Sequence, residues 1–250
     1  MISQMKTSNK LLIALGLGIL LGIGGIQVAL YSNYRKGRIV SPKALHAEKY
    51  KRYDMAAPSY LSLNGILWVN IIPSDTFYVE LPKTAASSLS YRQSGDTLLI
   101  TGNNNIAIHR PFADWFYRGN QAQVNIHCQG LKNISVTNGQ LYLQGTDDKG
   151  SLPSARIHTD SSTVWIGDYR EQGPKTAAKE YFDSLNIQSV NSIFLLNASA
   201  SIRKLQVKMD DRSELNDRQA LIDSLTVNYS SNSRVGLTGD NLKKAILSAH

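Results

Sequence analysis

A short phrase recurs through the second half of the chain and limits its fold more than any other feature. The phrase is an apolar residue, two further residues and an apolar-x-apolar pair. It occurs as LKNISV (131–136), LPSARI (152–157), FDSLNI (182–187), IRKLQV (202–207) and IDSLTV (222–227). Its fourth positions are occupied by Ile134, Ala155, Leu185, Leu205 and Leu225. Apart from one longer step after Ala155, they recur about every 20 residues, which is typical of a solenoid whose turns bury their apolar side chains against each other.

Each unit also contains a second apolar run, which predicts two short strands per turn. These runs are LYL (141–143), VWI (164–166), IFLL (193–196), SEL (213–215) and RVGL (234–237). A leucine-rich repeat would place asparagine at the ninth position of each phrase, but Gly139, Val190, Asp210 and Ser230 occupy it. We therefore expect an all-β, β-helix-like solenoid with about 20 residues per turn. The long step contains GDYREQGPKTAAKEY (167–181), which predicts one inserted surface loop.

The region between 61 and 130 also has the pattern of short strands. ILWVNII and TFYVEL are β-branched and aromatic and flank the turn PSD, and SYRQSGDTLLITG predicts a hairpin with Gly95 at its turn. QAQVNIHCQ alternates apolar and polar residues. The β domain is therefore expected to span residues 61–250.

The N-terminal segment Leu11–Tyr31 carries no charge, and Gln27 is its one polar side chain. At about 1.5 Å per residue, a helix of this length crosses a hydrocarbon core of about 30 Å. The segment is longer than the apolar region of a signal peptide and no convincing cleavage site follows, so we predict an uncleaved signal-anchor. A cleaved signal peptide is the alternative. Ala14, Gly18 and Gly22 recur at every fourth position, a spacing that lets two membrane helices form a homodimer.

The charge distribution separates the membrane region from the body. Residues 1–60 carry 9 Lys and Arg and 2 Asp and Glu, whereas the rest carries 18 and 17, which argues against a nucleic-acid-binding body. The expected domains are a short cytoplasmic tail (1–10), the transmembrane segment (11–31), a basic juxtamembrane linker (32–60) and the β domain. Basic residues flank both ends of the span and slightly favour a cytoplasmic body. We nevertheless expect a single-pass inner-membrane protein whose β domain lies in the periplasm or outside the cell.

Several of these motifs resemble the auto-transporter adhesin, head GIN domain family of Bacteroidetes. The resemblance covers residues 61–240 and rests on NGILWVNIIPSDTFYVELP, SGDTLLITG and the rungs LKNISVTNGQLYL, LQVKMDDRSEL and LTVNYSSNSRVGL. It implies a right-handed β-helix-like fold, extracytoplasmic placement and no established catalytic residues. The chain departs from the family in its long anchor, because many members are lipoproteins and no lipidation cysteine is present here. The order of Gly95 and Asp96 is also reversed.

No pattern in the sequence marks a reaction, and we predict neither a metal nor a cofactor. Cys128 lies in an alternating stretch and is interpreted as a small buried residue. His158 and Asp160 share a strand face without a serine-hydrolase motif. KMDDR (208–212) places two carboxylates beside two bases, which a carbohydrate-active β-helix enzyme would use, but a solvated turn is the favoured interpretation.

The strongest candidate for a surface site is HRPFADWFYRG (109–119), which concentrates Phe112, Trp115, Phe116 and Tyr117. These aromatics form either a binding platform or a cap on the open end of the solenoid. We predict a non-catalytic, adhesin-like binding or structural module of the cell envelope, with an envelope glycan or protein as its partner. The alternatives are a β-helix polysaccharide lyase or hydrolase, and a cytoplasmic scaffold.

Overall fold

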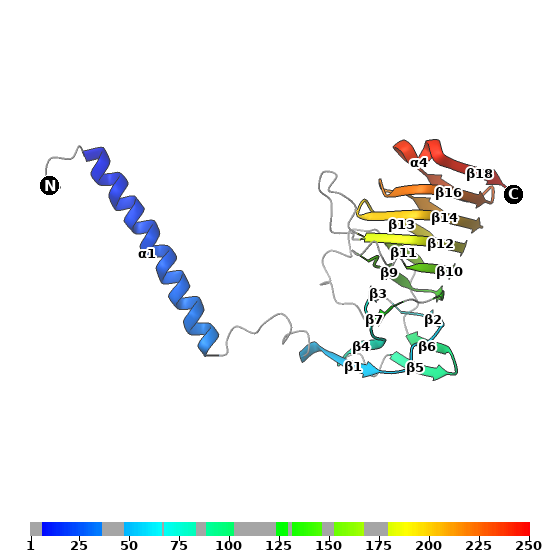
Figure 1. The fold of residues 1–250 in the computed structure, drawn as a ribbon, viewed down its shortest axis with the longest axis horizontal. Coiled ribbons are helices and arrows are strands. Elements are labelled where there is room, and N and C mark those ends of the chain that lie inside the picture. Colours follow the sequence, from blue (N-terminus) through cyan, green and yellow to red (C-terminus); the bar gives the residue numbers. More distant parts are fainter. Residues whose placement is uncertain are drawn as a thin grey trace. The chain divides into compact units, whose positions relative to one another are not determined.

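The computed structural model describes residues 7–36, 48–66, 68–83, 89–102, 124–129, 132–146, 153–167 and 180–250. It divides into two compact units, Met1–Lys49 and Tyr50–His250. The first unit contains one long helix, and the second is almost entirely β (Figure 1). The predicted combination of an N-terminal apolar helix with a β body is therefore confirmed.

Helix α1 (Thr7–Arg35) contains the predicted apolar span. Its Leu11–Arg35 portion is long and apolar enough to cross a membrane, a property that anchors and signal sequences share. A methyl group added at Gly18 or Gly22 would meet no atom of this chain within 4 Å. The small-residue stripe is thus not used for packing within the described part of the chain, and the homodimer stays a prediction.

The body contains two mixed sheets, each with nine strands among the described residues. In sheet A the order is β1–β4–β7–β3–β9–β11–β13–β15–β17. These strands span Tyr50–Asp54, Tyr78–Pro82, Val124–Cys128, Val69–Pro73, Gln140–Leu143, Thr163–Ile166, Ile193–Leu196, Glu214–Asn216 and Arg234–Gly236. In sheet B the order is β18–β16–β14–β12–β10–β8–β2–β6–β5. These strands span Ala245–Ala249, Leu221–Tyr229, Ala200–Asp210, Glu180–Val190, Ser154–Asp160, Asn133–Thr137, Tyr60–Asn64, Thr97–Gly102 and Leu89–Ser94.

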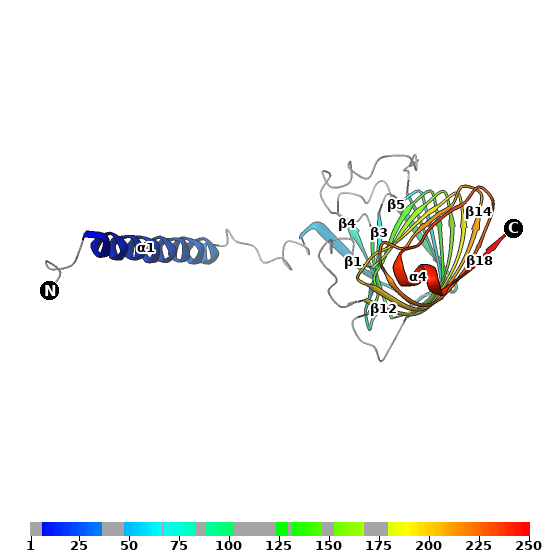
Figure 2. The same cartoon turned by 90° about the horizontal axis from the view of Figure 1, so that it is seen from above.

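From β8 onward the chain alternates between the two sheets, so that each repeat unit supplies one strand to each (Figures 1 and 2). Within each sheet, successive units pair in parallel, and Leu185, Leu205 and Leu225 lie side by side on β12, β14 and β16. The predicted second strands are confirmed as β9, β11, β13, β15 and β17. The two sheets remain separate and do not close on each other.

The repeated phrase has a structural meaning in the long strands of sheet B. In β14, Ile202 and Leu205 are buried while the two residues between them, Arg203 and Lys204, are both exposed. The strict inward–outward alternation of a strand is therefore shifted by one residue at this point. The same shift occurs in β12 and β16. The two intervening residues of the phrase thus mark a corner, and the three apolar residues point into the core.

One predicted register is wrong. The repeated phrase aligns Ile134 with Ala155, but β8 and β10 pair Ile134 with Ile157. A slip by two residues keeps every apolar side chain on the same face, so hydrophobic pattern alone does not distinguish the two registers. In the observed register, Ile134 and Ile157 continue an inward column through Ile187, Val207 and Val227.

The corners from sheet B to sheet A are held by a serine ladder. Ser162, Ser192 and Ser213 are buried at equivalent positions of three successive units. The amide of Ser162 donates to Oγ of Ser192 at 3.2 Å, and the amide of Ser192 donates to Oγ of Ser213 at 3.4 Å. Each hydroxyl also donates to a carbonyl of its own turn, so these buried polar groups are paired.

The ends of the body differ from expectation. Strand β1 lies inside the segment 32–60 that the sequence assigned to a linker, and it pairs antiparallel with β4. At the other end, the short helix α4 (Gly239–Lys244) precedes β18, which pairs in parallel with β16. Both pieces are too short for a distinctive periodicity, which is why the pattern of the sequence does not predict them.

Candidate binding face

The outer face of sheet B presents polar side chains in straight rows across the strands. One row joins β2, β8, β10, β12, β14 and β16 in register and consists of Tyr60, Asn133, Arg156, Asn186, Gln206 and Thr226. A second row, two residues further along, consists of Ser62, Ser135, His158, Gln188, Lys208 and Asn228. Neighbouring members of a row lie about 4.8 Å apart, which is the strand spacing. The face is therefore a regular array in which amide and hydroxyl groups predominate.

This array results from the sequence pattern of the repeats. In β12 and β14, every second residue after the corner is a buried apolar or small residue. The residues between are Asn186 and Gln188 in β12 and Gln206 and Lys208 in β14, followed at the strand ends by Val190 and Asp210. Asn186 Nδ2 lies 3.5 Å from Gln206 Oε1, so the amides of one row are close enough to interact with one another. Amides and hydroxyls both donate and accept hydrogen bonds. The face can therefore bind a partner rich in hydroxyl groups.

An exposed tyrosine stands at one end of this face. Tyr60 on β2 is 51% exposed, and its diagonal neighbour Leu99 on β6 is 41% exposed. The turn at Asp96 fixes the start of β2, because the amide of Ser59 donates to Asp96 Oδ1 at 2.8 Å and the amide of Tyr60 donates to the Asp96 carbonyl at 3.1 Å. The hydrogen bonds from Ser59 lower the pKa of Asp96 below its ordinary value. The ionised carboxylate thus holds Ser59, and the backbone carbonyl of Asp96 holds the amide of Tyr60.

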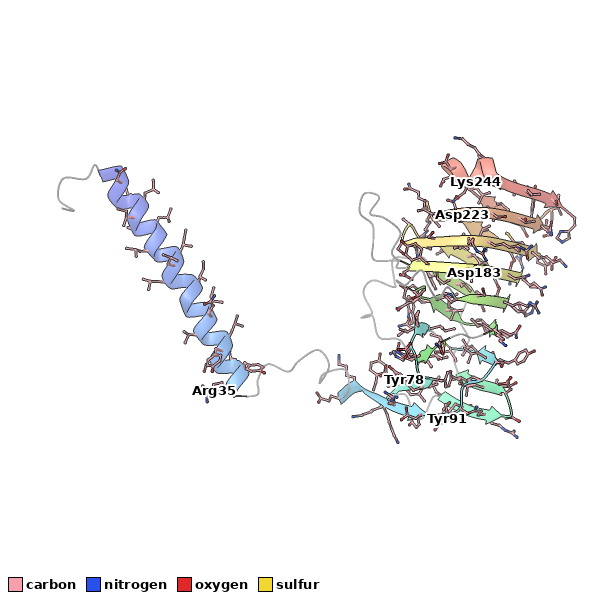
Figure 3. All side chains as sticks on the ribbon, viewed as in Figure 1. Arg35, Tyr78, Tyr91, Asp183, Asp223 and Lys244 are labelled. Atoms are coloured by element: carbon pink, nitrogen blue, oxygen red, sulfur yellow. The ribbon has the colours of Figure 1, made fainter. Side chains whose placement is uncertain are left out.

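Charged residues on sheet B are paired along its borders. Arg203 forms an ion pair with Asp183 at the corner between successive units, and Asp223 occupies the equivalent corner of β16 (Figure 3). At the other border, Asp210 Oδ1 lies 2.9 Å from His250 Nε2, and Lys208 Nζ lies 3.6 Å from Asp210 Oδ2. The hydrogen bond with His250 is the main cause that lowers the pKa of Asp210.

The outer face of sheet A carries a second cluster, which the sequence pattern does not predict. Trp68 stacks on Trp165 with ring centroids 5.3 Å apart, and its ring centroid lies 6.5 Å from that of Tyr142. Tyr142 and Trp165 are buried, together with Leu195. The three aromatics come from distant parts of the sequence. They meet because sheet A aligns Asn70, Tyr142 and Trp165 in one row, a register that only the paired strands define.

A polar network continues this row toward β1. Asn70 accepts from the Trp68 indole and donates to Asn125 at 3.0 Å, and Asn125 donates to Glu80 at 3.4 Å. His127 Nε2 also lies 3.4 Å from Glu80 Oε2. The network therefore joins β3, β7 and β4 through their side chains.

A stack of three side chains lies beside this network. The His127 ring stacks on Tyr78 with centroids 4.1 Å apart, and the Arg52 guanidinium lies 3.8 Å from the centroid of the Tyr78 ring. Burial, followed by repulsion from Glu80, raises the pKa of Tyr78. The phenol thus stays neutral, and the stack attaches β1 to the rest of sheet A.

The predicted site residues have different outcomes. Phe112, Trp115, Phe116 and Tyr117 lie outside the described residues, so the choice between cap and platform stays a prediction. Cys128 is buried, as predicted. Asp160 accepts a hydrogen bond from the Ser161 hydroxyl at 2.9 Å, and within the described part of the chain no hydrogen bond joins it to His158.

The two carboxylates of KMDDR are separated by the structure. Asp210 ends β14 on the outer face, whereas Asp211 has a φ of 52° at the corner. No cluster of three or more His, Cys, Asp or Glu side chains that could hold a metal ion occurs among the described residues. The carboxylate of Asp210 forms ion pairs with His250 and Lys208. We therefore interpret the two neighbouring aspartates as part of a turn.

Comparison with known proteins gives distant structural neighbours. No family model matches the sequence, and no curated protein matches it. A putative adhesin from Parabacteroides merdae aligns with a TM-score of 0.46 and 9% identity over 80% of this chain and 74% of its own. A putative adhesin from Parabacteroides distasonis aligns with a TM-score of 0.45 and 13% identity over 80% and 75%.

A putative lipid binding protein from Parabacteroides distasonis has a TM-score of 0.28 and 10% identity, with 81% of this chain and 96% of its own covered. Such low identities and TM-scores carry no functional argument. The function must therefore be argued from the side chains that the two sheets present.

Proposed function

We propose that this chain is a membrane-anchored binding module of the cell envelope whose sheet B binds an extended glycan without cleaving it. The observation that carries the proposal is the pair of straight polar rows on sheet B, the first of which ends at the exposed Tyr60. Sugar hydroxyls are both donors and acceptors, as are the amides of Asn186 and Gln206. A tyrosine ring supplies an apolar platform with a polar tip, which suits the face of a sugar ring.

The repeat favours a polymeric ligand over a small one. A row of similar side chains at about 4.8 Å intervals offers many weak, equivalent contacts. Linked contacts of this kind gain affinity through their high effective concentration, although each contact is weak. A flat face also lacks the concave geometry that buries most of a small ligand. We therefore infer that affinity rises with glycan length.

We also make a proposal about the fold, which concerns how the repeat units coil through the two sheets. We infer that the units from β8 onward form a right-handed β-solenoid of about 20 residues per turn, as the head GIN resemblance implies. The alternation between sheets and the parallel pairing within each sheet support this inference. Parallel crossover connections are right-handed in about 98% of cases, which supports the handedness.

The location follows from α1 and from the proposed ligand. We infer that Leu11–Tyr31 is an uncleaved anchor in the inner membrane and that the body lies in the periplasm or outside the cell. Protease treatment of intact spheroplasts tests this topology: an exported body is digested. A body that stays protected would support the cytoplasmic-scaffold alternative.

The enzyme alternative has less support in the geometry. A glycosidase needs one carboxyl group that stays protonated near neutral pH and a second one facing it. On sheet B, Asp210 is held by His250 and has a lowered pKa, and Asp183 is paired with Arg203. The hydrogen bond with His250 favours the ionised form of Asp210. The role that best explains these two paired carboxylates is therefore to hold the structure of the face, and not to transfer a proton.

Binding is tested with the full-length chain in lipid nanodiscs against an array of envelope polysaccharides and their fragments. We expect Tyr60→Ala to weaken binding about tenfold, because loss of an aromatic anchor typically costs more than about 1 kcal/mol. The double change Asn186→Ala with Gln206→Ala should weaken binding similarly. Tyr91→Ala is the matched control, since Tyr91 is exposed but pairs with Tyr53 at the end of the body. Equal affinity in all four proteins would refute the proposed face, and release of shorter glycans would refute the non-catalytic function.

A further inference from the structure

The final strand of sheet B has an open edge. Within the described residues, β18 pairs with β16 on one side, and no strand pairs with its other side. Its outer backbone N–H and C=O groups are therefore available to another chain. Such an edge is a template for strand pairing unless the sequence protects it.

The edge is apolar as well as open. Ile246 and Leu247 of β18 are 65% and 43% exposed, and Leu242 of the preceding helix α4 is 56% exposed, although all three are large hydrophobic residues. Leu247 pairs with Val227 and is therefore the end of the buried inward column. It is exposed because, in the described part of the chain, no further strand covers it. The inward column of sheet B thus continues up to this edge, and no strand of the described residues extends it further.

The other end of the body is protected in the usual way. Strand β1 reads YKRYD and β5 reads LSYRQS, so both N-terminal edges carry charged residues. Charged side chains on an edge oppose pairing with another sheet. Strand β18 reads AILSA and has no charge between Ala245 and Ala249. Of the two described ends of the body, the β18 end therefore has the composition of a pairing surface.

We propose that two copies of this chain dimerise by antiparallel pairing of their β18 strands around a two-fold axis at Leu247. This arrangement places Ala245 opposite Ala249 of the second copy, Ile246 opposite Ser248, and the two Leu247 residues opposite each other. Each inward residue then faces an inward residue, because the register preserves the period of two. The inward columns of the two bodies become continuous.

A second copy suits this edge better than a parallel stack of copies. A two-fold contact uses the same surface twice and closes, whereas a head-to-tail contact leaves an end free and continues into a filament. Head-to-tail stacking here would also place β18 against the charged strands at the N-terminal end of the next copy. The antiparallel pair avoids those charges and covers the apolar edge of both copies.

The contact is expected to be weak. One five-residue strand with two large exposed apolar side chains, Ile246 and Leu247, buries less than the roughly 800 Å² per partner that a stable interface requires. Pairing therefore becomes populated only where copies are concentrated, for example when α1 holds them in one membrane. The dimer does not depend on glycan binding, so either proposal can fail without the other.

Cysteine crosslinking of the full-length chain in liposomes tests this dimer. In Leu247→Cys, the two introduced thiols face each other on directly paired residues, at a separation that a disulfide spans. Asn228→Cys is the matched control, because Asn228 is exposed on β16, one strand in from the edge. Its two copies would be three strand spacings apart, about 14 Å, which is beyond disulfide reach. The unsubstituted chain, which contains the buried Cys128, measures how much disulfide-linked dimer forms without an introduced cysteine.

We expect Leu247→Cys to give a dimer band about tenfold stronger than Asn228→Cys under mild oxidation. Adding Ile246→Lys should abolish this band, because a charged side chain on the edge strand opposes pairing with another sheet. Adding Thr226→Lys instead, on the same face but one strand in, should leave the band. Equal bands for Leu247→Cys and Asn228→Cys would overturn the proposal, as would a band that survives Ile246→Lys.

Discussion

Four turn residues with left-handed backbone mark corners at which the chain passes from sheet B to sheet A. Asn138, Ser161, Asn191 and Asp211 have φ values of 50°, 51°, 48° and 52° at equivalent positions. Asn and Asp adopt this conformation more readily than other non-glycine residues, because their short polar side chains bond locally. Ser161 is the exception among the four. The corner at Ser161 is therefore the least well matched to its residue.

We expect Ser161→Asn to stabilise the body by about 0.5 kcal/mol, since asparagine tolerates the left-handed conformation better than serine. The reverse change, Asn191→Ser, should destabilise it by a similar amount. Both are measured as free energies of unfolding in urea, with the unsubstituted chain alongside. If the two substitutions shifted stability in the same direction, residue preference at the corner would not be the cause.

At the residue scale, the sequence predicts which side chains point inward but not every register. The inward positions Leu185, Leu205 and Leu225 could be predicted because they recur at a constant step. The pairing of Ile134 with Ile157 could not, because a two-residue slip leaves the apolar pattern unchanged. The contact between Trp68 and Trp165 on the outer face of sheet A could not be predicted for a related reason, since it depends on strand order.

At the scale of elements, α4 is held over the end of the core by one buried carboxylate. Asp217 accepts hydrogen bonds from both the amide and the hydroxyl of Thr238 at 2.7 Å each, and from Asn241 Nδ2 at 3.0 Å. Asn241 also donates to the carbonyl of Ala220 at 2.6 Å. Asp217 is fully buried, so removing it would take away the acceptor that Thr238 and Asn241 share.

Asp217→Ala is therefore expected to destabilise the body by about 3 kcal/mol, the range for a broken buried network of charged hydrogen bonds. Asp240→Ala is the control, because Asp240 lies in the same helix and forms an exposed ion pair with Lys243. Loss of such a pair should change stability by less than about 1 kcal/mol. Urea unfolding followed by circular dichroism measures both, and equal effects would show that Asp217 does not hold the cap.

Elements with a repeated pattern could be predicted, and elements that end the repeat could not. Strands β9, β11, β13, β15 and β17 were expected because each follows the phrase at a similar distance. Helix α4 and strand β18 follow no such pattern. Their position is set by Asp217 and by the pairing of Leu225 with Ala245, and both are tertiary contacts.

At the scale of the whole molecule, successive repeat units have the same length, so one unit can take the structural position of the next. Asn197 and Asp217 occupy equivalent positions of successive corners, as do Ala200 and Ala220. In each corner, the amide of the alanine donates to the carbonyl of the residue three positions earlier. Stability in such an array is the sum of contacts within units and between neighbouring units. Removing one complete unit should therefore leave a foldable chain.

Deletion of residues 186–205 tests this directly. It joins Leu185 to Gln206, and the pairing of β12 with β14 makes this junction continuous, since Asn186 lies beside Gln206. Strand β15 then takes the place of β13 beside β11, and the Asp217 cap is retained. We expect a folded body with an unchanged β-type circular dichroism spectrum. Deletion of residues 186–195 removes half a unit, misaligns every later strand between the two sheets and should prevent folding. If both deletions were tolerated, or neither, successive units would not be interchangeable and the solenoid proposal would lose its main support.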